Sequence, residues 1–428
     1  MTSRFPLLSL LALGSGLLAP LPALAGGADA KAIAANYAEM GLATYEDALT
    51  TAQALDTAIG VLIAAPSPDT LSAARRAWVA ARIPYQQSEA FRFGNPVVDE
   101  WEGRVNAWPL DEGLIDYVDA GSYGTESDDN TLFTANVIAN DTVLINGKEV
   151  DASQISPEFI ASTLHEAGGI EANVASGYHA IEFMLWGQDL NGTKPGAGDR
   201  PFTDFVQGEG CTNGNCDRRA AYLAAASRLL VSDLKEMVAN WKTGGAARTA
   251  IETRDAKATL AAVLTGMGSL SYGELAGERM KLGLLLHDPE EEQDCFSDNT
   301  HASHLNDAIG IRNVYLGRYS RVDGSVIEGP SVSDAVAGTD KGLDEELLGK
   351  LDKTVAAMEA MAGRAERGEA YDQMIGEGNA QGNAVVQAAI DALIDQTRSI
   401  ERAVAALGLD GVTIEGSDSL DKADAVFK

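Results

Sequence analysis

Apolar residues recur every three or four positions over most of the chain, the period of one buried face of an α-helix. The clearest stripe lies near the C-terminal end, and two shorter stripes precede it. We expect all three to be packing faces of bundle helices and therefore predict an all-α fold. Their residues are Val386, Ile390, Leu393, Thr397, Ile400, Val404 and Leu407; Leu347, Leu351, Val355 and Met358; and Leu230, Leu234, Met237 and Trp241.

Two long helices are predicted near the start of the chain. The first covers residues 28–62 and is expected to break or bend at Gly41, because glycine weakens a helix interior. The second covers residues 67–88, with Ser67 as its N-cap and Pro84 as the point of a kink.

One segment departs from the helical period. Thr142–Ile145 and residues 148–150 flank Asn146-Gly147, which favours the positive φ angles of a tight hairpin turn. We predict a small β-hairpin insertion here. Ser156-Pro157 then begins another helix, which is expected to end at Gly168-Gly169.

The chain length and one long loop predict two domains. With 428 residues the chain exceeds the size at which one core usually keeps growing. Residues 187–216 are rich in Gly, Asn, Asp and Pro, which is typical of a loop. We predict two helical-bundle domains, over residues 26–205 and 206–428, with a binding site at their seam.

The N-terminal segment has the pattern of a secretory signal peptide. Arg4 precedes an apolar run over residues 5–18, and Ala23-Leu24-Ala25 offers a small-residue cleavage site, so residues 1–25 are expected to be removed. Since no cysteine stands at the cleavage point, no lipid anchor is expected. Since no later apolar run reaches about 18 residues, no transmembrane segment is expected in the mature chain. These features predict a periplasmic protein.

The charge balance argues against nucleic acid as a partner. The chain has 32 basic and 63 acidic residues, a net charge of −31, which repels nucleic acid phosphates and anionic lipid surfaces. Acidity favours cations as ligands, although a solvated acidic surface is the simpler explanation for most of these carboxylates.

Three cysteines remain in the predicted mature chain. Cys211 and Cys216 share a Gly/Asn-rich loop and are expected to form a disulfide in an oxidising compartment. Cys295 has no obvious partner and is either a buried or a reactive thiol; we favour a buried one.

The strongest candidate for chemistry is a histidine and a glutamate three residues apart, His179 and Glu182, within the apolar segment Gly177–Gly187. On a helix, residues at this spacing lie on one face, so the imidazole and the carboxylate can reach the same metal ion or each other. A buried hydrogen-bonded pair without metal is the simpler alternative.

This segment resembles the GxHxxE signature of the imelysin family, and the resemblance extends from about residue 35 to about residue 407. Three further segments are similar to the family: Arg82–Phe93, Trp108–Gly113 and Asp294–His301. The resemblance implies a helical, periplasmic or surface-anchored bacterial protein tied to iron uptake. It favours His179 and Glu182 as metal ligands.

Residues of two similar segments are further candidates for the site. Arg82 and Glu89 follow helical spacing, so Glu89 is a possible oxygen ligand held by Arg82; a structural Arg–Glu pair is an equally good interpretation. Asp111 is a possible site-lining residue, although it could also cap a following helix.

A second ligand cluster is predicted from Asp294, Asp298 and His301, which also follow helical spacing. Ser297-Asp298 could instead cap a helix that begins near residue 300. His301 is favoured over His304 because it matches the family pattern. His165 and His287 have no such context and are read as surface or cap residues.

Three functions fit these observations. The first is binding of iron, or of an iron-containing ligand, in iron acquisition, with a membrane transport partner; mixed nitrogen and oxygen donors suit iron but do not exclude zinc. The second is a zinc metallopeptidase, although the His-Glu-x-x-His signature is absent because His165-Glu166-Ala167-Gly168-Gly169 lacks the second histidine. The third is a metal-free binding module. We favour the first, a binding protein and not an enzyme.

Overall fold

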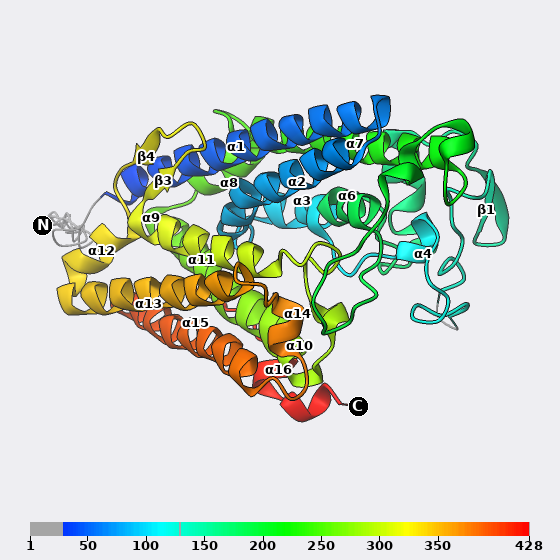
Figure 1. Cartoon of the computed structure of the whole chain (residues 1–428). Helices are drawn as coiled ribbons and strands as arrows, with labels where there is room; N and C mark the ends of the chain where they lie inside the picture. Colours follow the sequence, from blue (N-terminus) through cyan, green and yellow to red (C-terminus); the bar gives the residue numbers. More distant parts are fainter. Residues whose placement is uncertain (1–28, 128–129, 428) are drawn as a thin grey trace, which may run out of the picture.

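The first two long helices, α1 (Ala30–Ala64) and α2 (Pro68–Ser88), lie side by side in the computed structural model (Figure 1). The structure describes residues 29–127 and 130–427, so the expected signal peptide lies outside the described residues. Asp29 caps α1 by accepting a hydrogen bond from Lys31 N. Ser67 and Thr70 form a reciprocal capping box at the start of α2.

Helix α1 runs without a break through Gly41, so the prediction of a break at this position is wrong. A Cβ atom at Gly41 would lie 2.8 Å from Cε3 of Trp241, the last residue of α7 (Cys216–Trp241). Gly41 therefore permits the close approach of a tryptophan, and the alternative of a bend stays a prediction. Pro84 lies within α2, and the helix continues past it to Ser88.

A second set of helices fills the lower half of Figure 1. Within it α13 packs against α15 and α11, and α15 packs against the π-helical segment η6. The stripe near the C-terminus lies on α15, where Val386, Ile390, Leu393 and Ile400 are fully buried. The bounds are α9 (Ala256–Ser269), η6 (Leu270–Lys281), α11 (Thr300–Leu316), α13 (Lys341–Ala365) and α15 (Ala380–Ala406).

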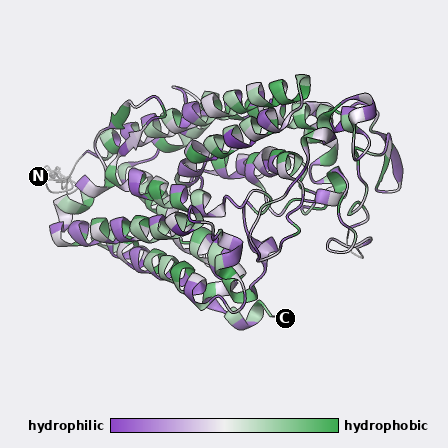
Figure 2. Ribbon diagram, in the orientation of Figure 1, coloured by the Kyte–Doolittle hydropathy of each residue, from purple (hydrophilic) through white to green (hydrophobic). Residues whose placement is uncertain are grey.

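The two sets of helices are packed against each other. Helix α11 contacts α2, and α9 contacts α1. Helix α7, which follows the long loop, packs on α1 and on α6 (Gly177–Trp186). Figure 2 shows alternating hydrophilic and hydrophobic bands along the long helices, as expected for helices that bury one face. The mostly helical fold class is confirmed; the boundary between two domains stays a prediction.

The predicted hairpin is confirmed: β1 (Thr142–Ile145) pairs antiparallel with β2 (Lys148–Asp151). Asn146 and Gly147 have the positive φ angles, 50° and 73°, that the turn requires. A second hairpin, β3 (Arg318–Ser320) with β4 (Val326–Glu328), was not predicted. Its strands have three residues each, too few to show an alternating pattern.

The helix expected after Ser156 is shorter than predicted. Ser156 accepts a hydrogen bond from Phe159 N, as a cap does, but the continuous helix ends at Leu164, and a separate 3-10 turn covers Ala167–Gly169. Glu166 lies between them in the left-handed region, with a φ of 54°, and interrupts the helix.

The remaining elements are short. They are η1 (Glu89–Phe91), α3 (Pro96–Asn106), α4 (Glu112–Ile115), α5 (Pro157–Phe159), η2 (Ile160–Leu164), η3 (Ala167–Gly169), η4 (Phe202–Phe205), η5 (Gly208–Gly210), α8 (Ala246–Glu252), α10 (Leu282–Leu286), η7 (Pro289–Glu291), α12 (Val332–Thr339), α14 (Tyr371–Ile375), α16 (Asp418–Asp421) and η8 (Ala423–Ala425). Within the described ranges, no helix has the length and apolar character needed to cross a membrane.

Candidate metal centre

Helix α6 carries the His179–Glu182 pair, and all ten of its residues are buried. Gly177 begins the helix with a φ of 82°, and a Cβ there would lie 2.3 Å from the carbonyl oxygen of Val105 in α3. Only glycine allows this approach. The indole of Trp78 in α2 donates to the carbonyl of Tyr178 at 2.9 Å. The glycine of the GxHxxE pattern therefore lets α6 pack closely against α3, while the Trp78 hydrogen bond joins α6 to α2.

His179 and Glu182 of α6 and Asp294 from another segment form a group that could hold a metal ion. Nδ1 of His179 lies 2.9 Å from Oε2 of Glu182 and 3.9 Å from Oδ1 of Asp294. One ligand atom from each residue lies within 4.8 Å of the others, and all three side chains are 0% exposed. Nε2 of His179 has no hydrogen-bond partner among the described residues. The group supplies one nitrogen donor and two carboxylates, a mixed set that suits transition metals.

Asp294 comes from the linker that joins α10 to α11, which we call the 287–299 segment. This segment also fixes Glu182, because Ser297 donates to Oε1 from its backbone N at 3.0 Å and from its hydroxyl at 2.6 Å. Hydrogen bonds of this kind orient ligands around a metal. The segment thus supplies one member of the group and positions another.

Three further side chains hold Asp294. Arg82 of α2 donates to Oδ1 at 2.8 Å, Asn299 donates to Oδ2 at 3.0 Å, and the Ser303 hydroxyl also donates to Oδ2. Arg82 itself is 1% exposed and donates to Oδ1 of Asn106 at 2.6 Å. A buried charge of each sign is therefore paired.

Burial and neighbouring charges set the protonation of the group. Burial, reinforced by Arg82, lowers the pKa of His179 to about 3, so its imidazole is neutral and able to donate a lone pair. Burial and the neighbouring Asp294 raise the pKa of Glu182 well above its ordinary value. Burial would raise the pKa of Asp294 too, but Arg82 and His179 outweigh it and hold that pKa low. In the metal-free protein, Asp294 is therefore ionised and His179 is neutral.

The structure separates Arg82 from Glu89, which were expected to act together. No bond joins them within the described part of the chain; Glu89 instead accepts from Arg279 of η6 at 2.7 Å. Helix α2 ends at Ser88 and Glu89 begins the 3-10 turn η1, so the α-helical spacing used to align the two residues does not extend to Glu89.

Asp111 behaves as a cap. It precedes α4 and accepts from Leu114 N at 3.3 Å, from the Tyr123 hydroxyl at 2.8 Å and from Asn130 at 3.0 Å. These three bonds occupy its carboxylate, which favours the structural interpretation over a ligand role.

The expected cluster of Asp294, Asp298 and His301 is divided. Asp294 joins His179 and Glu182, whereas Asp298 lies with Glu292 and Asp372. Asp298 does not cap α11: the cap position is Asn299, and Asp298 has a φ of 56°. Burial lowers the pKa of His301, and its Nδ1 has no hydrogen-bond partner in the ranges described.

His165 and His287, which were not expected to act as ligands, each lie within hydrogen-bond distance of a neighbouring residue. Nδ1 of His165 lies 3.2 Å from the Ser176 hydroxyl, and Nδ1 of His287 lies 2.6 Å from the carbonyl oxygen of Ile375. His287 ends α10 in the left-handed region, as a C-terminal cap does. His304 is fully buried and stands edge-on to Tyr371, 5.2 Å between ring centroids.

Cys211 and Cys216 are joined in a disulfide. Cys295 is a free thiol of intermediate burial, more accessible than expected. Burial, together with the charge of Glu182, raises its pKa well above the ordinary value, so the thiol stays protonated and unreactive.

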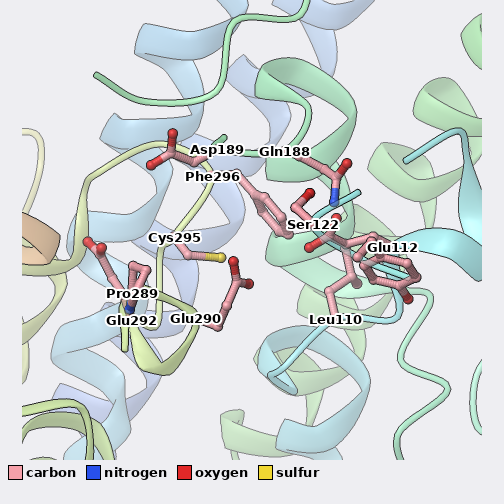
Figure 3. A pocket seen from close by; sticks show the side chains of 11 residues that line it. Leu110, Glu112, Ser122, Gln188, Asp189, Pro289, Glu290, Glu292, Cys295 and Phe296 are labelled. Carbon is pink, nitrogen blue, oxygen red and sulfur yellow. The ribbon is translucent and has the colours of Figure 1, made fainter. Parts of the chain in front are cut away.

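An acidic cavity of about 260 Å³ adjoins the group (Figure 3). Four carboxylates, those of Glu112, Asp189, Glu290 and Glu292, line it together with Cys295 and other residues. Phe296 also lines it and packs on Phe183 of α6, with ring centroids 5.2 Å apart. The 287–299 segment supplies Glu290, Glu292, Cys295 and Phe296 to this "acidic cavity" and Asp294 to the group, so the cavity and the group share that segment.

The residue spacing did not predict that Asp294 lies with His179 and Glu182. Its segment was recognised as similar to the imelysin family, but its spacing to Asp298 and His301 suggested a separate cluster. The usable signal was the resemblance itself, because two segments that share one family pattern can share one site.

Known proteins resemble this chain in sequence and in structure. Iron-regulated protein A of Synechococcus elongatus is 35% identical over 72 residues, which cover 17% of this chain and 20% of that protein. A solved structure from Parabacteroides distasonis, provisionally named an iron-regulated protein A precursor, superposes with a TM-score of 0.62 and 19% identity. The superposition covers 89% of this chain and 95% of the other, and at this identity it shows a shared fold.

A family model gives the broader match. The model described as Imelysin, Peptidase_M75, aligns with residues 41–400, which include α6, the 287–299 segment and most of the helices of both sets. The chain belongs to the imelysin family.

Proposed function

We propose that this protein binds iron in the periplasm and serves iron acquisition, with His179, Glu182 and Asp294 as ligands. One observation carries the proposal: two carboxylates and a neutral imidazole converge at 0% exposure beside an acidic cavity. Membership of the imelysin family supports it, and so do the names of two relatives as iron-regulated proteins.

The chemistry of the donors agrees with a metal in this place. Two carboxylates near one imidazole repel each other when ionised, and a cation removes that repulsion. Binding would displace the proton that the raised pKa keeps on Glu182, so metal uptake releases a proton. Ser297 and Arg82 would hold the two carboxylates in place in both states.

Several earlier candidates keep a smaller place in this proposal. Arg82 acts as a positioning residue through Asp294. A role for Glu89, Asp111 or His301 as a further ligand stays a prediction. Delivery of the metal to a membrane transport partner also stays a prediction, and the disulfide between Cys211 and Cys216 agrees with an oxidising compartment.

The test is a calorimetric titration of the metal-stripped mature protein with ferrous, ferric and zinc ions. His179→Ala and Glu182→Gln are expected to lose tight binding while helix content is unchanged. Asp344→Asn is the matched control, since Asp344 is a buried carboxylate bonded to Tyr315 and Ser333 elsewhere in the fold.

Three outcomes decide between the functions considered. Tight stoichiometric iron binding that both variants lose supports the proposal. A preference for zinc, with hydrolysis of a casein substrate that His179→Ala abolishes, would replace it by a metallopeptidase. Absence of binding by any of the three ions would leave a metal-free binding module.

A further inference from the structure

A second cluster of acidic side chains lies apart from His179 and Glu182. It consists of Glu292 and Asp298, both in the 287–299 segment, and Asp372 in α14. One carboxylate oxygen from each lies within 4.8 Å of the other two. Glu292 is 1% exposed and Asp372 is 0% exposed, while Asp298 is half-buried. Residues some 75 positions apart in the sequence thus bring three carboxylates together.

The oxygens of this cluster lack partners. Both oxygens of Glu292, both of Asp372 and Oδ1 of Asp298 have no well-formed hydrogen bond from the described residues, although the Thr300 hydroxyl lies near Glu292 and the Gln373 backbone N–H lies near Asp372. Such groups are rare in folded proteins and call for an explanation, of which a missing ion is one. Two of these side chains are almost fully buried and direct an oxygen toward the others. The cluster is therefore more than an acidic patch on the surface.

Other buried carboxylates of this protein show what is missing. Asp294 pairs with Arg82 at 2.8 Å, Glu89 with Arg279 at 2.7 Å, and Asp116 with Arg219 at 2.7 Å. Within the described ranges, no arginine, lysine or histidine lies within ion-pair distance of the cluster of Glu292, Asp298 and Asp372. The cluster of Glu292, Asp298 and Asp372 thus differs from these three buried carboxylates, each of which has an arginine as its partner.

We propose that Glu292, Asp298 and Asp372 form a second cation site, which binds a hard divalent ion. Carboxylate oxygens alone suit hard ions such as Mn²⁺ and Ca²⁺, whereas the imidazole of His179 favours a softer transition metal in the first site. A bound cation supplies the missing counter-charge and the missing partners at once.

The acidic cavity offers a route to this second site. Glu292 lines the cavity and is also a member of the cluster, so an ion in the cavity meets one of its ligands directly (Figure 3). Asp294 of the first site lies two residues from Glu292 in the sequence. The second site does not require that the first one binds iron.

The experiment counts bound Mn²⁺ on the metal-stripped full-length mature protein, from the electron paramagnetic resonance signal of the free ion. We expect His179→Ala to retain one bound Mn²⁺. Adding Asp372→Asn to this variant is expected to weaken that binding at least tenfold, whereas adding Asp344→Asn leaves it unchanged. Ca²⁺ should compete with Mn²⁺ for the same site.

Two results would overturn the second site. One is that His179→Ala alone removes all bound Mn²⁺; the other is that the Asp372→Asn double variant binds Mn²⁺ as tightly as its parent. Either can occur whether or not iron binds at His179, so failure of this site and failure of the proposed function are distinguishable.

A thermal melt guards against a folding defect in the variant. Asp372→Asn removes a charge without a partner, so the metal-free variant is expected to melt no lower than the wild type. Mn²⁺ should raise the melting temperature of the wild type but not that of Asp372→Asn or of a second variant, Asp298→Asn. An equal rise in all three proteins contradicts the proposal.

Discussion

Arg82 and Asp294, which are 212 positions apart, form a buried ion pair between α2 and the 287–299 segment, with Nη2 2.8 Å from Oδ1. The guanidinium also lies 5.1 Å from the centre of the Tyr178 ring, at the start of α6. One arginine thus holds a candidate ligand and packs beside the helix that carries the other two.

Replacing Arg82 by glutamine is expected to destabilise the metal-free protein by about 3–5 kcal/mol, because it leaves Asp294 buried without its counter-charge. A urea denaturation series checks this value. The matched control is Arg104→Gln: Arg104 is 42% exposed and bonds Glu236 at 2.9 Å, and loss of such a surface pair costs about 0–1 kcal/mol. Equal losses in the two variants would show that Arg82 has no special structural role.

Ser297→Ala is expected to weaken metal binding at the first site about tenfold, because Glu182 then keeps only the backbone bond at Oε1. Calorimetric titration measures the change. Ser399→Ala serves as the control, since Ser399 likewise donates to a glutamate, Glu346, at 2.8 Å but lies on α15. The prediction fails if both serine variants bind metal as the wild type does.

The stability of the metal-free protein should depend on the protonation of Glu112 in the acidic cavity. Burial, with the charge of Glu290, raises the pKa of Glu112 from 4.5 to about 8. Between these values the folded protein holds a proton that the unfolded chain releases, so stability falls as the pH rises through this window.

Glu112→Gln removes this ionisable group and should flatten the pH dependence. Well above pH 8 the variant is expected to be more stable than the wild type by on the order of 5 kcal/mol, because the pKa rises from 4.5 to about 8 and each pH unit of that rise corresponds to about 1.4 kcal/mol. Below about pH 4.5 the two should converge. Denaturation curves at several pH values in chelating buffer measure this, and parallel curves would refute it.

Two glycines of α1 should respond in opposite directions to alanine. Gly41→Ala is expected to destabilise the protein by about 1–3 kcal/mol, because its Cβ would press on Trp241. Gly60→Ala is expected to stabilise by about 0.5–1 kcal/mol, because no atom lies within 4 Å of the added methyl group. Thermal denaturation of both variants tests the assignment of Gly41 as a packing residue.

The local features of this fold could be predicted from the sequence, because each depends on residues near one another. The i, i+3 spacing places His179 and Glu182 together on α6, and Asn146-Gly147 marks the first hairpin. The conformation of Asp298 could not be predicted, since a residue before a helix can cap it or turn in the left-handed region, and both patterns look alike in sequence.

Contacts between residues far apart in the sequence could not be predicted from the spacing of nearby residues. Ser297 lies 115 positions from Glu182, whose carboxylate it bonds. Asp294 approaches His179 because of the course of the 287–299 segment, which shows no helical pattern in the sequence. The packing role of Gly41 could not be predicted because the tryptophan that it contacts lies on another helix, 200 residues away in the sequence. In each case the partner, and not the residue itself, determines the role.

The complete burial of α6 has a consequence for the rate at which the first site exchanges its ion. His179 and Glu182 are 0% exposed, so a bound ion has no direct contact with solvent through them. Entry and release require a local opening. We expect the 287–299 segment to move, because it supplies Asp294, bonds Glu182 through Ser297 and lines the acidic cavity. At high metal concentration the uptake rate should therefore level off at the rate of this opening, and the residence time of the ion is set by the motion of the segment as well as by affinity.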